Sequence, residues 1–340
     1  MKILYDNIMK KNRMRMKKRG LLLFLLSMML LVTGCGVRIH PTLGSDRYLQ
    51  VGQRAVSGGA CRLVLASYQQ LCEKAYGNAD DNEIWSEQVT DSKTYWEYVR
   101  DQIVQEELFY AAGLSQIAES SGYVPNETQT RKIEEAASEY YGQLDAQTCT
   151  TLQLKEEDVK EAFLYYWEAM RCVEELSAGV TPELSEEETR VIEIQELSFA
   201  SEKEAQAAWE TMEGGDLSAW DDVSSVQEIA RGQKSAEYEE AAFRLQTGAY
   251  SEPLFTDGSW KILYCRSDYL EDASAANKEQ EYRRRKTESW KSVYDTWAKD
   301  REFWLDSSAW EKLEPFSGTN LPDFFSACQN LWEQSDSENE

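Results

Sequence analysis

The chain has 340 residues, of which 36 are basic and 61 acidic, so its formal net charge is −25. Such an excess of acid argues against a nucleic acid partner, because nucleic acid binding depends on Lys and Arg side chains that neutralise phosphates. A hydrophobic fraction of 42%, with 11 Trp and 18 Tyr, excludes a disordered tether, and the length predicts two or three structural units.

The first 34 residues have the three parts of a secretory signal. A stretch with eight Lys and Arg residues precedes an apolar run at 21–32, and small residues separate that run from Cys35. The run is about a dozen residues long, whereas an uncleaved transmembrane anchor, the alternative, needs roughly twenty. A cysteine directly after small residues resembles the lipobox of bacterial lipoproteins, in which the thiol receives a diacylglycerol. We therefore predict a signal peptide at 1–34 and a lipid on Cys35.

Removal of the signal peptide makes the remaining chain still more acidic. Residues 1–34 hold eight basic residues and one acid, so 28 basic and 60 acidic residues remain, with a formal net charge of −32. An anionic membrane surface would repel such a chain. The predicted attachment is therefore through the two acyl chains on Cys35, which suffice for stable anchoring. We predict an extracytoplasmic protein that is lipid-anchored to the cell membrane.

Six cysteines remain besides Cys35. An even number in an oxidising compartment permits disulfides, but the spacings are irregular and most of the six lie in apolar helical stretches, where a thiol behaves as a small hydrophobe. We favour buried thiols, although the sequence leaves the pairing open for Cys61, Cys72, Cys149, Cys172, Cys265 and Cys328. The sequence has no Cys-x-x-Cys motif and no Cys/His cluster, so we predict no metal and no cofactor.

Helical periodicity dominates the first half of the mature chain. After a polar tether at 35–48, alternating apolar residues at 47–56 predict a short strand, and Ser57 is placed to cap the helix that follows. Apolar residues at spacings of three to five, with acids between them, predict amphipathic helices. These helices are expected at 57–76, 92–121, 127–144 and 155–177. Pro182 marks the end of this helical domain, 49–182.

The hydrophobic period changes at Arg190, where alternation replaces helical spacing. Residues 191–199 predict a half-buried strand, and a capping box formed by Ser201 and Glu204 predicts a helix after it. A second short helix and a final strand are expected at 235–245 and 260–265. Strand, helix, helix and strand together predict a small α/β module at 187–268.

Beyond 268 the chain is predicted to be helical again, from about 273 to 304. Four aromatic residues lie on one stripe of this helix at i, i+4, i+7 and i+14, and we expect the stripe to pack on the N-terminal helices. The four are Trp290, Tyr294, Trp297 and Trp304. Residues 273–332 are therefore predicted as C-terminal helices that pack on the N-terminal domain, and residues 333–340 as a frayed acidic tail.

One segment is similar to a motif of parvulin-type prolyl isomerases. Residues 236–251 read AEYEEAAFRLQTGAYS, and the parvulin motif reads PEFExAAFxLxxGxxS; the similarity continues through 252–262. Together with the order of lipobox, helical domain, small module and returning helix, this resembles the extracytoplasmic foldases of the PrsA/SurA type. The resemblance implies an α+β fold, in which a mostly helical SurA-N-like chaperone domain carries an inserted small α/β parvulin-like (PpiC) domain and a long C-terminal helix returns to the helical domain.

The chain departs from the parvulin pattern at both histidines of the isomerase site. Glu196 stands where the first-strand histidine would be and Lys261 where the last-strand histidine would be, and the only histidine of the sequence is His40. Lys234 replaces a methionine of the implied proline pocket. The residues that would line this pocket are Tyr238, Phe243, Trp260 and Leu197. An ion pair between Glu196 and Lys261 is one substitute that would hold the same strands together, and we expect weak or absent peptidyl-prolyl isomerase activity.

Two functions of different classes follow. The first is a membrane-tethered foldase or chaperone for unfolded or nascent secreted polypeptides. The sequence leaves open whether this protein forms a dimer. The second is a non-catalytic scaffold lipoprotein that uses the parvulin-like module as an interaction platform. A solute-binding lipoprotein is the poorest alternative, because the chain lacks the alternating βα units of two lobes. In the first function, aromatic side chains of the helical domain would contact the client; the alternative is that the same side chains pack in the core. These residues are Trp96, Tyr98, Tyr165, Tyr166 and Trp167.

Overall fold

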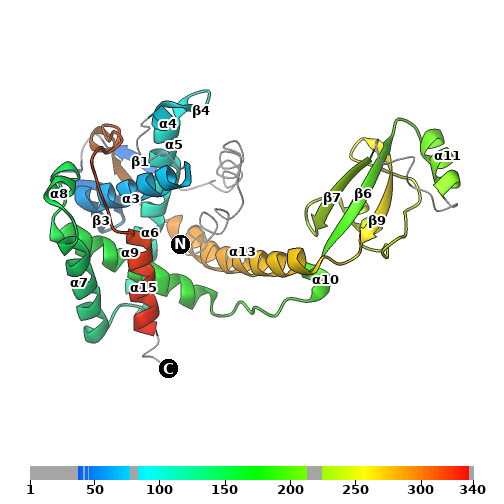
Figure 1. Cartoon of the computed structure of the whole chain (residues 1–340). Coiled ribbons are helices and arrows are strands. Elements are labelled where there is room, and N and C mark those ends of the chain that lie inside the picture. Colours follow the sequence, from blue (N-terminus) through cyan, green and yellow to red (C-terminus); the bar gives the residue numbers. More distant parts are fainter. Residues whose placement is uncertain (1–36, 41–42, 45, 77–82, 213–223, 337–340) are drawn as a thin grey trace. The chain divides into compact units, whose positions relative to one another are not determined.

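The computed structural model describes residues 37–40, 43–44, 46–76, 83–212 and 224–336. The chain divides into two compact units (Figure 1). We call the residues up to 178 together with those from 289 onward the helical unit, and residues 179–288 the sheet unit. The predicted signal peptide and Cys35 lie outside the described residues. Among the residues that are described, no helix is long and apolar enough to cross a membrane.

A four-stranded sheet brings segments from both ends of the chain together in the helical unit. Its strands, in order across the sheet, are β1 (Val37–His40), β10 (Phe303–Asp306), β2 (Arg47–Val51) and β3 (Arg54–Ser57). Strand β1 runs parallel to β10, and the other neighbours are antiparallel. The single strand expected at 47–56 is thus a hairpin. It turns at Gly52, whose φ of +55° is a backbone conformation that favours glycine.

The helices of this unit follow the amphipathic stretches of the sequence. They are α3 (Gly58–Tyr76), α4 (Glu83–Ser86), α5 (Tyr95–Tyr98), the π-helical segment η3 (Val99–Val104), α6 (Gln105–Ser121), α7 (Glu127–Gly142), α8 (Ala146–Thr151) and α9 (Glu156–Ser177). Ser57 caps α3 as predicted, because its Oγ accepts a hydrogen bond from the Ala60 N–H at 3.1 Å. The helix expected from 92 begins only at Tyr95, since β4 (Gln88–Thr90) and β5 (Lys93–Thr94) pair just before it.

The core of the helical unit is rich in aromatic side chains. The five aromatic residues considered above as client contacts are all buried, with between 2 and 8% of their surface exposed: Trp96, Tyr98, Tyr165, Tyr166 and Trp167. Burial of a large aromatic side chain in a packed core removes it from any surface contact. In this structure the five side chains therefore pack in the core, and none of them is exposed to a client.

The long helix α13 (Glu271–Ala298) begins in the sheet unit, and its last turns belong to the helical unit. These turns pack as the aromatic stripe predicts: Trp290 and Tyr294 lie against Tyr110, with ring centroids 5.4 and 4.7 Å from the Tyr110 ring. Gly113 permits the close approach, because a Cβ atom at this position would lie 2.6 Å from the Tyr294 ring.

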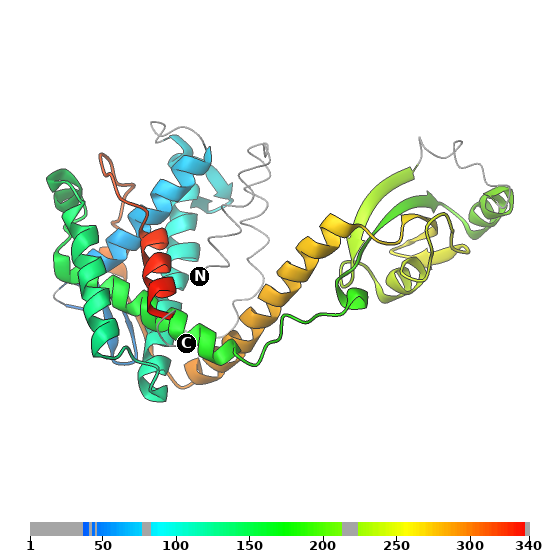
Figure 2. The ribbon, with the colours of Figure 1, turned by 60° about the horizontal axis from the view of Figure 1, so that its bottom comes forward.

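The chain beyond α13 differs from the prediction. The helix ends at Ala298 and Trp304 belongs to strand β10, so the predicted helix to 304 is wrong there. After β10 come α14 (Ser307–Trp310) and α15 (Phe324–Asp336). Helix α15, drawn in red, packs against α3, α7 and α9 (Figure 1, Figure 2). The C-terminal residues thereby contribute to the core of the helical unit.

The sheet unit is built on a four-stranded antiparallel sheet with the order β7-β6-β9-β8. Its strands are β6 (Val191–Phe199), β7 (Ser224–Ala230), β8 (Leu254–Thr256) and β9 (Ser259–Ser267). Its short helices are α10 (Glu186–Thr189), α11 (Glu202–Met212) and α12 (Ala236–Ala242). The two predicted strands and two predicted helices are present, and β7 and β8 are additional. The fold class is α+β, as predicted.

Glu107 is a buried carboxyl group in the core of the helical unit. It accepts hydrogen bonds from the hydroxyl groups of Tyr68 and Tyr166, but burial outweighs these bonds and raises the pKa of Glu107. A carboxyl group whose pKa is higher in the folded than in the unfolded state binds more protons when folded. Its contribution to stability therefore falls as the pH rises above the unfolded pKa, toward the folded pKa.

We expect Glu107→Gln to remove this pH dependence, because the amide keeps the shape of the protonated carboxyl without an ionisable group. The free energy of unfolding of the helical unit, measured with urea at pH 5 and pH 7, should change less with pH in the variant than in the wild type. At pH 7 the variant should be at least as stable as the wild type. A clear loss of stability at pH 7 would show that the ionised carboxylate stabilises the core.

Candidate functional site

Along β6 and β9, successive side chains point to opposite faces of the sheet, and each face packs under a helix. On one face, Ile192 and Ile194 of β6 pack with Leu263 and Cys265 of β9 under helix α12. On the other face, Leu197 of β6 packs under helix α11, in a cluster with Ile262, Ala208 and Met212. Because successive side chains of a strand point to opposite faces, Glu196 and Lys261 lie on the α12 face.

Glu196 and Lys261 form an ion pair across strands β6 and β9. Lys261 Nζ donates to Glu196 Oε1 at 2.7 Å, and each side chain is only about a tenth exposed. Gln227 of β7 completes the arrangement, because its Nε2 donates to Glu196 Oε2 at 2.9 Å and lies 3.1 Å from the Tyr238 hydroxyl. We call Glu196, Lys261, Gln227 and Tyr238 the polar network. It joins three strands and helix α12.

The charges of the polar network are held in fixed states. Burial alone would raise the pKa of Glu196, but the Lys261 ammonium group, with Tyr238 and Gln227, outweighs burial and holds this pKa below its usual value. Burial and the Glu196 carboxylate raise the pKa of Tyr238. At neutral pH the network therefore contains an ionised Glu196 and a protonated Tyr238. Two lysines lie near the Tyr238 ring, with Lys234 Nζ 5.4 Å and Lys261 Nζ 5.7 Å from its centroid.

The structure brings together some of the predicted site residues and separates others. Tyr238 and Phe243 lie on the α12 face and are nearly inaccessible, at 0 and 5% exposed. The Phe243 ring is further covered by the guanidinium groups of Arg190 and Arg231, at 5.3 and 4.3 Å. Leu197 and Trp260 lie on the opposite, α11 face: Leu197 packs under α11, and Trp260 pairs directly opposite the Phe199 of that cluster. The four residues therefore do not surround one cavity.

Gln227 is the member of the polar network that the sequence did not reveal. It lies on β7, a strand that was not predicted, and an isolated glutamine carries no signal of its own. Once β7 is known, its pairing with β6 predicts the contact: Gln227 lies directly opposite Ile194, which places it diagonally next to Glu196 on the same face.

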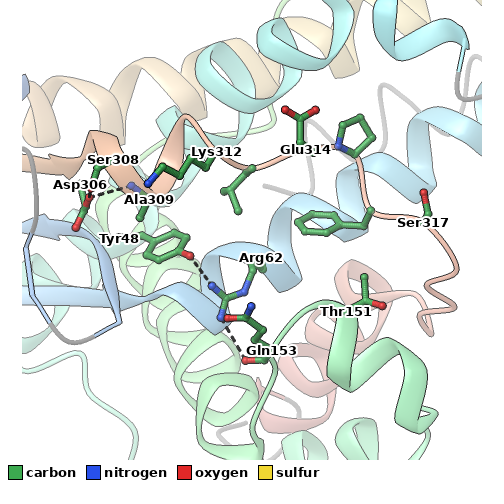
Figure 3. Close-up of a pocket in the computed structure, with 13 residues that line it drawn as sticks. Tyr48, Arg62, Thr151, Gln153, Asp306, Ser308, Ala309, Lys312, Glu314 and Ser317 are labelled. Atoms are coloured by element: carbon green, nitrogen blue, oxygen red, sulfur yellow. Dashed lines mark hydrogen bonds between the residues drawn. The ribbon is translucent and has the colours of Figure 1, made fainter.

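A pocket of about 680 Å³ lies in the helical unit. Figure 3 shows Tyr48, Arg62 and Gln153 joined by hydrogen bonds beside this space, with Lys312 and Ser317 of the C-terminal segment also lining it. The Arg62 guanidinium group is hydrogen-bonded within the protein: it donates to the Tyr48 hydroxyl at 2.6 Å and to the Gln153 carbonyl at 3.2 Å. The pocket combines such polar groups with the apolar side chains of residues 313, 315 and 316.

Cysteines and acids do not gather into a metal centre in the part of the chain that the structure describes, where no cluster of three or more His, Cys, Asp or Glu side chains could hold an ion. The cysteines for which pairing was left open are free thiols, and most of them are buried. Burial raises the pKa of the buried thiols Cys61 and Cys328 well above its usual value, so these thiols are poor nucleophiles.

No family profile matches this chain, and no curated protein matches it. Among solved structures, the chain is similar to the peptidylprolyl isomerase PrsA from Bacillus cereus, with 15% identity, a TM-score of 0.35, and 71% of this chain and 96% of that chain covered. It is also similar to the foldase protein PrsA from Lactococcus lactis, with 12% identity, a TM-score of 0.29, and coverage of 85% and 99%.

A third similar structure belongs to the SurA-like chaperones PEB4 and Cj1289 of Campylobacter jejuni, with 9% identity, a TM-score of 0.26, and coverage of 76% and 98%. The PrsA/SurA resemblance given by the sequence motif thus recurs among solved structures.

Proposed function

We propose that this chain is a lipid-anchored, extracytoplasmic foldase or chaperone that holds unfolded secreted polypeptides, and that its parvulin-like module is weakly active or inactive as an isomerase. The observation that carries the second part is the polar network. Its Glu196 and Lys261 stand where the sequence resemblance expects the histidine pair, and its Tyr238 is one of the residues expected to line the apolar proline pocket.

The chemistry of prolyl isomerisation explains why the polar network matters. The reaction makes no covalent bond to the enzyme and needs only stabilisation of a twisted amide, whose barrier is ~18–20 kcal/mol. An apolar pocket that holds the proline ring and excludes water would supply part of that stabilisation. Here the Glu196 carboxylate and Lys261 ammonium satisfy each other at 2.7 Å, and Lys234 adds a second cation beside Tyr238. A proline ring placed beside Tyr238 would therefore meet charged groups where an isomerase of this type has an apolar pocket.

The membrane attachment is proposed from the sequence around Cys35. We expect Cys35→Ser to abolish incorporation of labelled palmitate and to release the protein from the membrane fraction into the soluble fraction. Cys149→Ser is the matched control, because it removes a thiol from the mature chain and should leave both properties unchanged. If the Cys35→Ser protein stays unlabelled but remains in the membrane fraction, the segment before Cys35 is an uncleaved anchor.

The chaperone activity is tested by aggregation of an unfolded client. The mature chain, residues 35–340 with Cys35→Ser, should suppress light scattering by chemically denatured citrate synthase when present at a small molar excess. The scaffold function is the second candidate, and one observation favours it: the aromatic residues considered as client contacts are buried. An absence of any suppression would favour the scaffold and contradict the chaperone.

A further inference from the structure

Residues 311–323, which we call the strap, connect α14 to α15 without forming a helix or a strand. The strap, drawn in brown between α14 and the red helix α15, runs along the surface of the helical unit (Figure 1). Most of its side chains are exposed or half-buried, and Leu313 and Leu321 are its buried ones, at 7 and 4% exposed. The strap is therefore an irregular segment, and its Leu313 and Leu321 side chains join the core of the helical unit.

Two adjacent glutamines of α3 bind the strap as a neighbouring strand would. The Gln69 side-chain amide donates to the Phe316 carbonyl at 2.9 Å and accepts from the Phe316 N–H at 2.8 Å. The Gln70 side-chain amide makes the same pair of bonds with Leu321, at 2.9 and 3.1 Å. Each side-chain amide thus replaces a peptide group, and it pairs with both the donor and the acceptor of one strap residue.

Further side chains from other elements also bind the backbone of the strap. The Trp96 Nε1–H donates to the Leu313 carbonyl at 2.7 Å, and Arg100 donates to the same carbonyl at 3.3 Å. Near the other end, the Tyr140 hydroxyl donates to the carbonyl of residue 322 at 2.9 Å, and Thr148 Oγ1 accepts from the N–H of residue 320 at 3.0 Å.

Together these side chains form a groove whose hydrogen bonds go to backbone groups of the bound segment. We define the backbone groove by its six side chains: Gln69, Gln70, Trp96, Arg100, Tyr140 and Thr148. Backbone N–H and C=O groups are present in every polypeptide, so a site built from such bonds tolerates almost any sequence. Apolar contacts beside these bonds then select for hydrophobic side chains, as side-chain pockets do in peptide recognition by strand addition. Here Phe316 supplies such a contact, with its ring centroid 6.0 Å from the Trp96 ring.

We propose that the backbone groove is the site at which this protein binds extended segments of unfolded polypeptides, and that the strap is its resident occupant, which a client displaces. This inference rests on the proposed chaperone function and names its binding site. The preferred client segment carries apolar side chains at the spacing of Leu313, Phe316 and Leu321, that is, three and then five residues apart. The pocket of Figure 3, lined by strap residues 312–317, provides adjoining space for a bulkier chain.

The two ends of the strap are held by elements that do not belong to the backbone groove. Helix α15 holds its far end through Phe324, which is 0% exposed, and β10 holds the near end through its pairing with β1 and β2. Displacement of the strap then exposes the groove while both anchors stay in place. A client that displaces the strap has to replace the burial of Leu313 and Leu321, which belong to the core of the helical unit, and this is why the preferred client segment is apolar at those places.

The test uses the full mature chain with Cys35→Ser and a fluorescein-labelled synthetic peptide of residues 311–323 as the probe. Phe316→Ala together with Leu321→Ala weakens the strap and leaves the groove intact, so the variant should bind the peptide at least tenfold more tightly than the parent chain in fluorescence anisotropy. Adding Gln70→Met should reverse the gain, because methionine keeps the length of glutamine but cannot form the two bonds. Phe255→Ala, an exposed aromatic of the sheet unit, is the matched control and should change nothing.

Client binding is then measured by displacement of the peptide. Reduced, carboxymethylated α-lactalbumin, which stays unfolded, should displace the peptide from the strap variant, and it should increase amide hydrogen exchange of residues 311–323 in the parent chain. If the parent chain suppresses aggregation but this client neither displaces the peptide nor changes exchange of the strap, the chaperone function stands and the groove is not its site. Failure of the strap variant to bind the peptide also overturns the inference, whatever the aggregation assay shows.

Discussion

Phe324→Ala should lower the free energy of unfolding of the helical unit by about 4 kcal/mol, because truncation of a fully buried phenylalanine removes its transfer free energy and leaves a cavity. Phe324 is 0% exposed and comes from the last helix of the chain. Its ring centroid lies 5.1 Å from Tyr166, 5.4 Å from Phe163 and 6.0 Å from Tyr140, so one side chain joins α15 to α7 and α9.

The change is measured by hydrogen exchange of peptides from α7 and α9 in increasing urea, which reports on the helical unit separately from the sheet unit. Val124→Ala is the matched control: Val124 is 46% exposed, and its truncation should cost less than about 0.5 kcal/mol. An effect of Phe324→Ala as small as that of the control would mean that α15 contributes little to the core.

Lys261→Met should lower the free energy of unfolding of the sheet unit by about 3 kcal/mol. Removal of one partner from a buried ion pair leaves an uncompensated charge, and the low end of the usual ~3–5 kcal/mol applies because both side chains keep about a tenth of their surface exposed. Lys278→Met, which removes an exposed lysine of the same unit, is the control and should be close to neutral.

Replacement of both partners should restore most of the lost stability. In a double variant with Glu196→Met and Lys261→Met no charge is left buried, and apolar replacements of similar size are often neutral or stabilising. The stability of the double variant should also depend less on pH in the acid range. In the wild type, the stability contributed by Glu196 is present above its unfolded pKa of about 4.3 and is lost as the pH falls through its lower folded pKa. A double variant as unstable as Lys261→Met alone would contradict the ion-pair interpretation.

The sequence predicts the amphipathic helices well because their periodicity follows from burial of one face. It fails where long-range pairing decides the structure. Trp304 fits the helical stripe by spacing, yet it lies in β10, which pairs with β2 from the other end of the chain. Strand β7 was missed because much of it is exposed, so its residues show little alternation of apolar and polar side chains.

Part of the candidate site could be predicted from the sequence, and part could not. The ion pair of Glu196 and Lys261 could be predicted because the motif places the two residues on adjacent strands. The separation of Leu197 from Glu196 also follows from alternation, because consecutive strand residues cannot share a face. The backbone groove could not be predicted, since its side chains bind the backbone of the strap and leave no pattern in the strap sequence.

If the polar network has replaced a working isomerase site, the protein should show no catalysis in a protease-coupled assay with a proline-containing tetrapeptide. The uncatalysed cis-to-trans change takes tens to hundreds of seconds at 25 °C, which leaves a wide window for detecting catalysis. With an active parvulin as the positive control, we predict that micromolar amounts of the mature chain leave the uncatalysed rate constant unchanged. Acceleration at a parvulin-like rate, lost in the Lys261→Met variant, would show that the polar network is itself an isomerase site.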